Sequence, residues 1–400
     1  MHKLRFLGLL LISIDASGHG NFSPPADPVL AASVMAGYTA SNVESDTLWR
    51  IPGVQMGGET FGPEQGFQLH EATLGLDYAN DDNVLGSAEI SSHGHGGSND
   101  LQLEQAFAGW FLESGEHALR LEAGKMKALF APQNARHASA ESFSQKPLVY
   151  DAFLGGHFTD TGARIRWQWR HDETRQLDAG IEVWRGDAFP ATSGEDARNL
   201  DAYLRYRIHG RVWDVLFGGW YLHSQARNRS DDRLTSGHDH GGVTSVSDDV
   251  VFNGQTGTGG LHGEFDYALG PKSRITVSAE YWSVSSEGEV RDTTRLIALD
   301  GDYAGYALQG AISRGAHALA LRYDQLILDN YVQGNGAELL AADAGLVSAE
   351  SNPDRYTVSH NWTLAQGLSL RTELIRDRTT ARLNTYGSLF LVWRQNFALY

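Results

Sequence analysis

Residues 163–170 read ARIRWQWR, and apolar and polar side chains alternate along them with a period of two. This period predicts a β-strand, because successive side chains of a strand point to opposite faces. One face carries two tryptophans and the other carries three arginines. Three arginines would be costly in a dry core, so the polar face is expected to meet water. The tryptophan face suits lipid and its interface.

The same alternation recurs along the chain from about residue 30 onward. Each segment has roughly the ten residues that a tilted strand needs to cross a bilayer. The pattern therefore predicts an all-β fold, a transmembrane antiparallel β-barrel of about sixteen strands. The predicted strands are 30–40, 66–78, 84–92, 101–112, 117–127, 161–170, 176–186, 199–209, 211–223, 257–269, 273–285, 303–313, 317–328, 355–364, 368–378 and 386–400.

Short polar turns alternate with long connections between these strands. Outer-membrane barrels have short periplasmic turns and long external loops, whereas a soluble propeller or sandwich has no reason to keep that parity. The long connections are predicted near 41–65, 128–160, 224–256, 286–302 and 329–354.

Composition excludes several kinds of chemistry. The 400 residues contain no cysteine, which rules out disulfides and thiolate sites. The formal net charge of -17, with no basic face evident, disfavours nucleic acid as a partner. The mean hydropathy of -0.34 resembles that of soluble proteins. It also fits a barrel, in which only every second residue of a strand is apolar.

The two ends of the chain have patterns of their own. Residues 1–18 are predicted to be a signal peptide, with a positive start and a short apolar run; a buried N-terminal strand is the alternative. Residues 19–29 would form a short periplasmic segment and residues 30–400 the barrel. The terminal aromatic Tyr400 is typical of barrels that the bacterial assembly machinery recognises. No later run approaches about twenty apolar residues, so no transmembrane helix is predicted.

Residues 117–167 carry a set of marks in a fixed order. These marks are Ala123-Gly124-Lys125, Asn134, His137, Phe143, Pro147-Leu148-Val149 and Phe153-Leu154-Gly155. The segment resembles bacterial outer-membrane porin-like proteins related to the phosphate-selective porin superfamily. It is most similar to the zinc-regulated, metal-starvation outer-membrane branch. Some relatives carry a His-x-His near this point, where this chain has the single His137.

The resemblance implies that the third external loop, 128–160, folds into the lumen and narrows it. The residues expected at this constriction are Asn134, Arg136, His137, Phe143, Lys146 and Phe153. Apolar content supports the expectation, because so many apolar side chains need a wall to pack on. They are Leu129, Phe130, Phe143, Leu148, Val149, Tyr150, Phe153 and Leu154.

Eight arginines are predicted to line the pore. They are Arg120, Arg164, Arg166, Arg170, Arg205, Arg207, Arg322 and Arg371. Such a set would attract small anions. Alternatively, acidic residues on the same inner faces neutralise it and give a lumen of mixed charge. These acids are Glu122, Asp201, Glu280, Asp324 and Glu373.

Two histidine pairs, His93/His95 and His238/His240, fall in segments expected outside the cell. Imidazoles two residues apart can bind zinc weakly. The alternative interpretation is the ordinary composition of a flexible polar loop. Apart from such weakly bound zinc, no cofactor is expected.

Catalysis is not predicted, because Ser139 near His137 is the one candidate pair noticed and no nucleophile turn surrounds it. The function expected is passive uptake of small solutes or ions through a bacterial outer-membrane channel. The resemblance adds zinc or trace-metal acquisition. The alternatives are an anion- or phosphate-selective porin and a non-conducting surface barrel that binds metal through its histidine loops. Outer-membrane lipid, lipopolysaccharide and the assembly machinery are the expected partners, and a homotrimer is left open.

Overall fold

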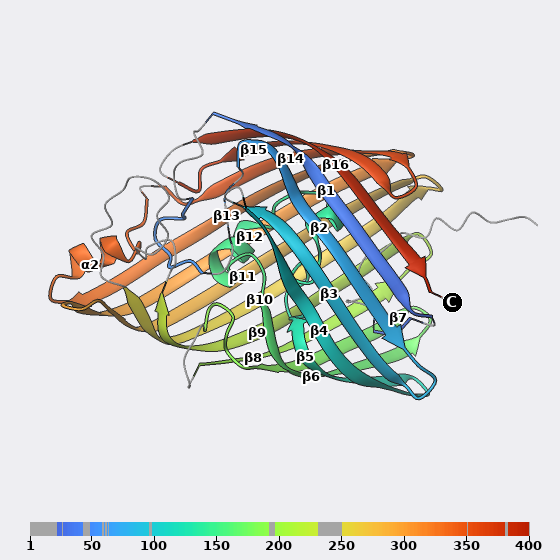
Figure 1. The fold of residues 1–400 in the computed structure, drawn as a ribbon, viewed down its shortest axis with the longest axis horizontal. Coiled ribbons are helices and arrows are strands. Elements are labelled where there is room, and N and C mark those ends of the chain that lie inside the picture. Colours follow the sequence, from blue (N-terminus) through green and yellow to red (C-terminus); the bar gives the residue numbers. More distant parts are fainter. Residues whose placement is uncertain are drawn as a thin grey trace, which may run out of the picture.

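Sixteen antiparallel strands form one closed barrel in the computed structural model (Figure 1). The last strand, β16, pairs with β1 along its length, from Val29 opposite Ala398 to Ser41 opposite Tyr386. The structure describes residues 22–399 apart from 26, 43–48, 58–59, 61, 63, 96–97, 192–196, 231–249, 350 and 381–382. The predicted fold class is therefore confirmed.

The strands follow the chain in order around the barrel. They are β1 (Val29–Ser41), β2 (Gly66–Ala79), β3 (Val84–His95), β4 (Ser98–Ser114), β5 (His117–Lys127), β6 (Thr159–Asp172), β7 (Arg175–Trp184), β8 (Arg198–His209), β9 (Trp213–Ser230), β10 (Val251–Gly270), β11 (Ser273–Arg291), β12 (Leu296–Arg314), β13 (His317–Gly334), β14 (Asp354–Ala365), β15 (Leu368–Asp377) and β16 (Asn384–Ala398). In the described parts of the connections lie three short helices: η2 (Ala138–Ala140), α1 (Leu148–Leu154) and α2 (Ala337–Asp343).

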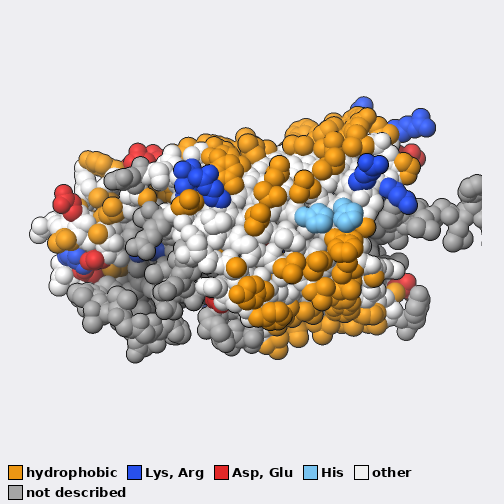
Figure 2. All heavy atoms as spheres, turned by 90° about the horizontal axis from the view of Figure 1, so that it is seen from above, with side chains coloured by type: hydrophobic (Ala, Val, Ile, Leu, Met, Phe, Trp, Pro, Cys, Tyr) orange, Lys and Arg blue, Asp and Glu red, His pale blue; other side chains and the backbone are white. Residues whose placement is uncertain are grey.

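Side chains alternate between the lumen and the exterior as predicted. On β6, Ile165 is 43% exposed on the outside, whereas Arg164 and Arg166 are 4% and 5% exposed on the inside. Figure 2 shows many hydrophobic side chains on the face of the barrel that it presents, and large exposed apolar residues occur on strands all around the barrel. An apolar exterior around a closed sheet suits lipid, because a closed sheet leaves no backbone group without a partner in the bilayer.

The connections at one rim are all short, whereas most of those at the other rim are long. Seven short turns lie at one rim: 80–83, 115–116, 173–174, 210–212, 271–272, 315–316 and 366–367. The other rim carries all the long connections, among them 128–158, which contains α1, and 335–353, which contains α2. The short-turn rim corresponds to the periplasmic side of outer-membrane barrels. No helix in the described part of the chain is long and apolar enough to cross a membrane.

Three predicted boundaries on the long-loop side are wrong. The loop expected at 286–302 is only the connection 292–295, and the loop expected at 224–256 shrinks to 231–250. The strands project past the apolar band, where outward positions meet water. Polar outward residues such as Glu287 and Asp302 therefore do not end them. His93 and His95, expected in an external loop, belong to β3, where His93 pairs with Asp100 of β4.

A charge placed on the lipid-facing surface should destabilise the barrel. Ile165 points outward in the middle of β6, so Ile165→Arg should lower the free energy of unfolding by about 2–4 kcal/mol. Urea titration of the protein refolded in lipid vesicles measures this. Ile165→Leu is the control, and equal stability of the two variants would mean that this face does not meet lipid.

Candidate functional site

The long connection 128–158 lies inside the barrel and packs its apolar side chains against one part of the wall. Phe130 contacts Trp220 with ring centroids 4.8 Å apart, and Tyr150 contacts Trp282 at 4.7 Å. Further ring pairs are Phe153 with Tyr303 and Phe158 with Trp184. All eight apolar residues singled out in the sequence are buried. The wall aromatics occupy inward positions on β7, β9, β11 and β12, where a water-filled lumen would carry polar residues.

Asn134 ties the two ends of this connection together. Its Nδ2 donates to the carbonyl oxygens of Ala128 and Phe158, both at 2.8 Å. Its Oδ1 accepts from the backbone N–H of Phe158 at 2.6 Å. The side chain is 1% exposed, and all its strong hydrogen-bonding groups are used. Asn134 therefore has a structural position at the base of the loop.

Three arginines of the barrel wall, on β8, β13 and β15, hold the loop by its carbonyl oxygens. Arg322 donates to the carbonyls of Gln145 and Lys146 at 2.8 and 3.1 Å. Arg371 donates to the carbonyl of Ala138 at 2.9 Å and also to that of Glu141. Arg205 donates to the carbonyls of Leu129 and Phe130. These three predicted arginines thus satisfy the backbone of the loop, which has no strand partner of its own.

Arg355 is a further anchor that was not predicted. It donates to Asp151 Oδ2 at 2.8 Å, to Gln145 Oε1 at 2.6 Å and to the Lys146 carbonyl at 2.9 Å. Burial raises the pKa of Asp151 to about 6, while Arg355 opposes that shift. Arg355 is the first residue of its predicted strand, and its neighbour Asp354 is buried as well. Alternation alone therefore did not predict that Arg355 faces the lumen.

The remaining predicted arginines contact other groups of the wall. Arg120 and Arg164 both pair with Glu122. The guanidinium of Arg166 lies 4.9 Å from the ring centroid of Phe22, which precedes β1. At the short-turn side, Arg170 pairs with Glu113 and Arg207 lies 3.8 Å from Asp214. Their surroundings are those of a wall of mixed charge.

Two cavities lie on either side of the loop. The cavity toward the long-loop rim has a volume of about 170 Å³, and the cavity toward the short turns has about 270 Å³. Gln133, Arg136 and Glu141 line both cavities. Arg136 Nη1 lies 3.4 Å from Glu141 Oε1. None of the eight arginines predicted to line the pore, all of them in described strands, borders either cavity.

Two β-bulges aim extra polar side chains into the upper cavity, the one toward the long-loop rim. Met35 pairs with Glu71 and Ala36 with Leu69, so His70 is the additional residue on β2. On β4, Glu104 is the additional residue between Leu103 and Gln105. A bulge places two consecutive side chains on one face. His70 therefore faces inward together with Glu71, and Glu104 together with Gln105, although strict alternation would turn one residue of each pair outward. Both His70 and Glu104 line the cavity.

The sequence does carry a signal for each bulge. Outward apolar residues on β2 switch from odd positions, Phe67 and Leu69, to even positions, Ala72 and Leu74. On β4 the same switch occurs after Leu103. A shift of the period by one residue indicates an inserted residue, because register and facing are coupled in a strand.

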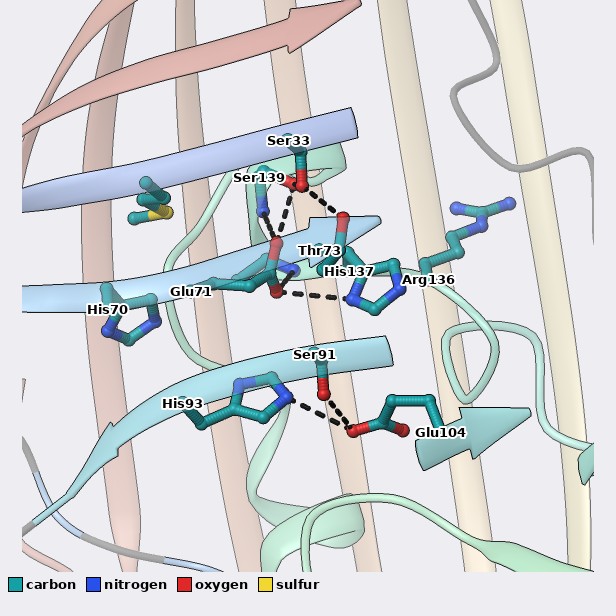
Figure 3. A network of polar contacts seen from close by, with 12 residues as sticks. Ser33, His70, Glu71, Thr73, Ser91, His93, Glu104, Arg136, His137 and Ser139 are labelled. Carbon is teal, nitrogen blue, oxygen red and sulfur yellow. Dashed lines mark hydrogen bonds and ion pairs between the residues drawn. The ribbon is translucent and has the colours of Figure 1, made fainter. Parts of the chain in front are cut away.

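A network of charged side chains joins the loop to this wall (Figure 3). His137 lies between two carboxylates, with Nδ1 3.3 Å from Glu71 and Nε2 2.9 Å from Glu89. Lys127 Nζ is 2.7 Å from Glu89 and 3.0 Å from His137 Nε2. The Ser139 hydroxyl donates to Glu71 at 2.7 Å, so it contacts a carboxylate rather than His137.

A second group of side chains surrounds Glu104. His93 Nε2 lies 3.3 Å from Glu104 Oε1, and Ser91 donates to the same oxygen at 2.6 Å. His157 Nε2 lies 3.7 Å from Glu104 Oε2, and burial lowers the pKa of His157 to about 4. Among the described residues, no three His, Asp or Glu side chains are arranged to hold a metal ion. The side chain of His95 and the whole of His238 and His240 lie outside the described residues.

Three other predicted loop residues are also placed. Phe143 lies under the Arg322 guanidinium, 4.7 Å from it. Lys146 Nζ donates to the carbonyls of Gln133 and Arg136 at 2.6 and 3.0 Å, and burial lowers its pKa to about 8. Phe153 stacks on Tyr303.

Two solved structures illustrate the likeness of this fold to known proteins. The outer membrane channel DcaP of Acinetobacter baumannii is 13% identical, with a TM-score of 0.53 over 94% of this chain and 100% of that chain. Salmonella typhi OmpF is 10% identical, with a TM-score of 0.51 over 92% and 97%. No protein-family model and no curated protein matches the chain. At these identities the likeness shows the fold, and this fold with an apolar exterior places the chain in the bacterial outer membrane.

Loss of an arginine anchor should release the loop. Arg355→Met leaves the Asp151 carboxylate buried without its cation, which should cost about 3 kcal/mol and raise the open fraction of the loop roughly a hundredfold. Trypsin cleavage after Arg136, which lies in the same loop, measures opening of the loop in the refolded protein. Arg185→Met, which removes a 73% exposed side chain, is the control. Unchanged protection in Arg355→Met would mean that the anchor does not hold the loop.

Loop anchoring should also depend on pH through His137. Burial and Lys127 oppose its charge, but Glu71 and Glu89 raise the pKa of His137 above its ordinary value. A base with a raised folded pKa stabilises the folded form below its ordinary pKa. It loses that contribution as pH rises through the folded value. Trypsin should therefore cleave the loop of the native protein more slowly than that of His137→Gln at about pH 6, and this difference should shrink as pH rises through the raised pKa of His137. A difference that grows with pH would contradict this.

Proposed function

We propose that this protein is a passive outer-membrane channel for small solutes, with the loop 128–158 as its constriction. The observation that carries the proposal is the pair of cavities that share the lining residues Gln133, Arg136 and Glu141. One cavity is lined from the long-loop half of the barrel and the other from the short-turn half. A solute crossing the barrel would pass between them beside the Arg136–Glu141 pair.

The charges along this route favour cations. Eight carboxylates and four basic side chains line the two cavities, histidines apart. The carboxylates are Glu64, Glu71, Glu104, Glu141, Asp151, Glu264, Asp266 and Glu280, and the bases are Lys127, Arg136, Lys146 and Arg394. A lumen with an excess of one sign concentrates ions of the opposite sign. We therefore infer a preference for cations rather than for phosphate or other anions.

The anion-selective alternative loses its main support. It depends on eight arginines exposed along the pore, and several of them donate to loop carbonyls or pair with Glu122 instead. A guanidinium that is already bonded offers less to a passing anion. Metal acquisition stays a prediction of the resemblance, with His93 beside Glu104 as its one described element.

One observation favours the non-conducting alternative. Most apolar side chains of the loop belong to the buried core cluster of the barrel, and several of the arginines that bond the loop are themselves buried. If the two cavities do not connect in the membrane, the barrel would be closed. Conductance separates the two interpretations directly.

Planar-bilayer recording of the refolded protein tests the proposal. We expect a steady ohmic conductance, and a reversal potential in a salt gradient with the sign of cation preference. Arg136→Ser removes the basic side chain shared by both cavities. It should raise the conductance and increase cation over anion permeability a few-fold.

The control for that variant is Arg175→Ser, in which a 52% exposed arginine at the short-turn rim is removed. Its selectivity should match that of the native protein. An intact barrel without conductance would overturn the channel in favour of a closed surface barrel. Conductance with anion preference would restore the arginine interpretation.

A further inference from the structure

His262 is a buried side chain of the lower cavity, the one toward the short turns, that the barrel does not satisfy. It points inward from β10, is 8% exposed and lines this cavity. Neither ring nitrogen has a hydrogen-bond partner in the described part of the chain. Buried polar groups are nearly always bonded, so an imidazole with two open positions facing a cavity indicates a missing partner.

The neighbouring strand makes room for this imidazole. His262 pairs with Gly218 of β9. A Cβ at Gly218 would lie 2.7 Å from His262 Cε1 and 2.6 Å from the Leu204 carbonyl oxygen. Any other residue at 218 would push the ring away. The position of the His262 ring therefore depends on two strands, since β10 carries the side chain and Gly218 of β9 leaves the space for it.

Other groups around the cavity are also open acceptors. The Oε1 of Gln309 on β12 is buried and has no partner among the described residues. Glu264 lies two residues from His262 on the same inward face, and no hydrogen bond or ion pair is found for it in the described part of the chain. Asp266 accepts from Thr276 at 2.5 Å, and Glu280 accepts from Gln133 at 2.7 Å. Both carboxylates add negative charge.

We propose that this cavity is a binding site for a small organic cation that carries two ammonium groups. The assignment rests on the cation-preferring channel proposed above and names its substrate class. An ammonium group donates three hydrogen bonds and carries the charge that Glu264, Asp266 and Glu280 attract. His262 and Gln309 supply neutral acceptors beside these carboxylates. An anion would meet four carboxylates of this cavity, counting Glu141.

The size of the cavity and its ligand geometry favour an organic cation over a bare metal ion. Its volume of about 270 Å³ is several times the roughly 30 Å³ share of one water molecule. No three described His, Asp or Glu side chains are arranged around one point as metal ligands would be.

Calorimetric titration of the refolded full-length chain in detergent with 1,4-diaminobutane tests the proposal. Binding should be measurable and should weaken about tenfold in His262→Leu and in Glu264→Gln, each of which removes one bond to the diamine. His223→Ala replaces an outward histidine of β9 and should bind like the native protein. Heat-dependent gel mobility shows that each variant is folded, and Glu264→Gln keeps the shape of the side chain.

Several results would overturn the site: no diamine binding, equal binding in both variants, or equal binding of butanedioate. Zinc binding that both variants lose, without diamine binding, would replace it by a metal site. The channel is judged separately. Conductance without diamine binding would refute this site alone, whereas diamine binding without conductance would refute the channel alone.

Discussion

The pairing of β1 with β16 is the constraint on which the rest of the molecule depends. In a bilayer no water is present to bond a free strand edge, so a membrane sheet must close on itself. Closure sets one face of every strand toward lipid and the other toward the lumen. The apolar exterior and the charged interior follow from it, as does the separation of short turns from long connections at opposite rims.

A sixteen-stranded barrel is wider than its own side chains can fill, and the loop 128–158 occupies part of that space. The lumen is consequently divided by chemistry. Inward aromatic residues on β7 to β12 form a dry surface on which the loop packs, and arginines on β8, β13, β14 and β15 bond its carbonyl oxygens. The polar residues left over border the two cavities. A solute would therefore meet only the charged side chains that do not bond the loop, and not all the charged side chains of the inner wall.

Alternation predicted all sixteen strands and the facing of their residues, because facing in a strand depends only on neighbours in the chain. It failed where strands leave the membrane, since outward positions then meet water and a polar residue there no longer marks the end of a strand. It also failed at the bulges of His70 and Glu104, although each shifts the apolar period by one residue. The inward aromatics Trp184, Trp220 and Trp282 carried a usable signal as well. Large apolar side chains in the lumen phase require something to pack against them.

The amino-acid sequence by itself determined the barrel, its strand order and the presence of an apolar loop between β5 and β6. Those properties follow from the alternation of neighbouring residues and from the lengths of the connections, both of which can be read along the chain. The partners of the charged side chains were decided only by the tertiary structure. Arg355 meets Asp151 across 204 residues, and Ser144 meets Glu373 across 229. An arginine in the lumen phase has the same sequence pattern whether it faces a solute, a carboxylate or a loop carbonyl. Closure of the barrel and the path of the loop decide which of these partners lies within hydrogen-bond distance of the arginine. That partner determines the role of the arginine.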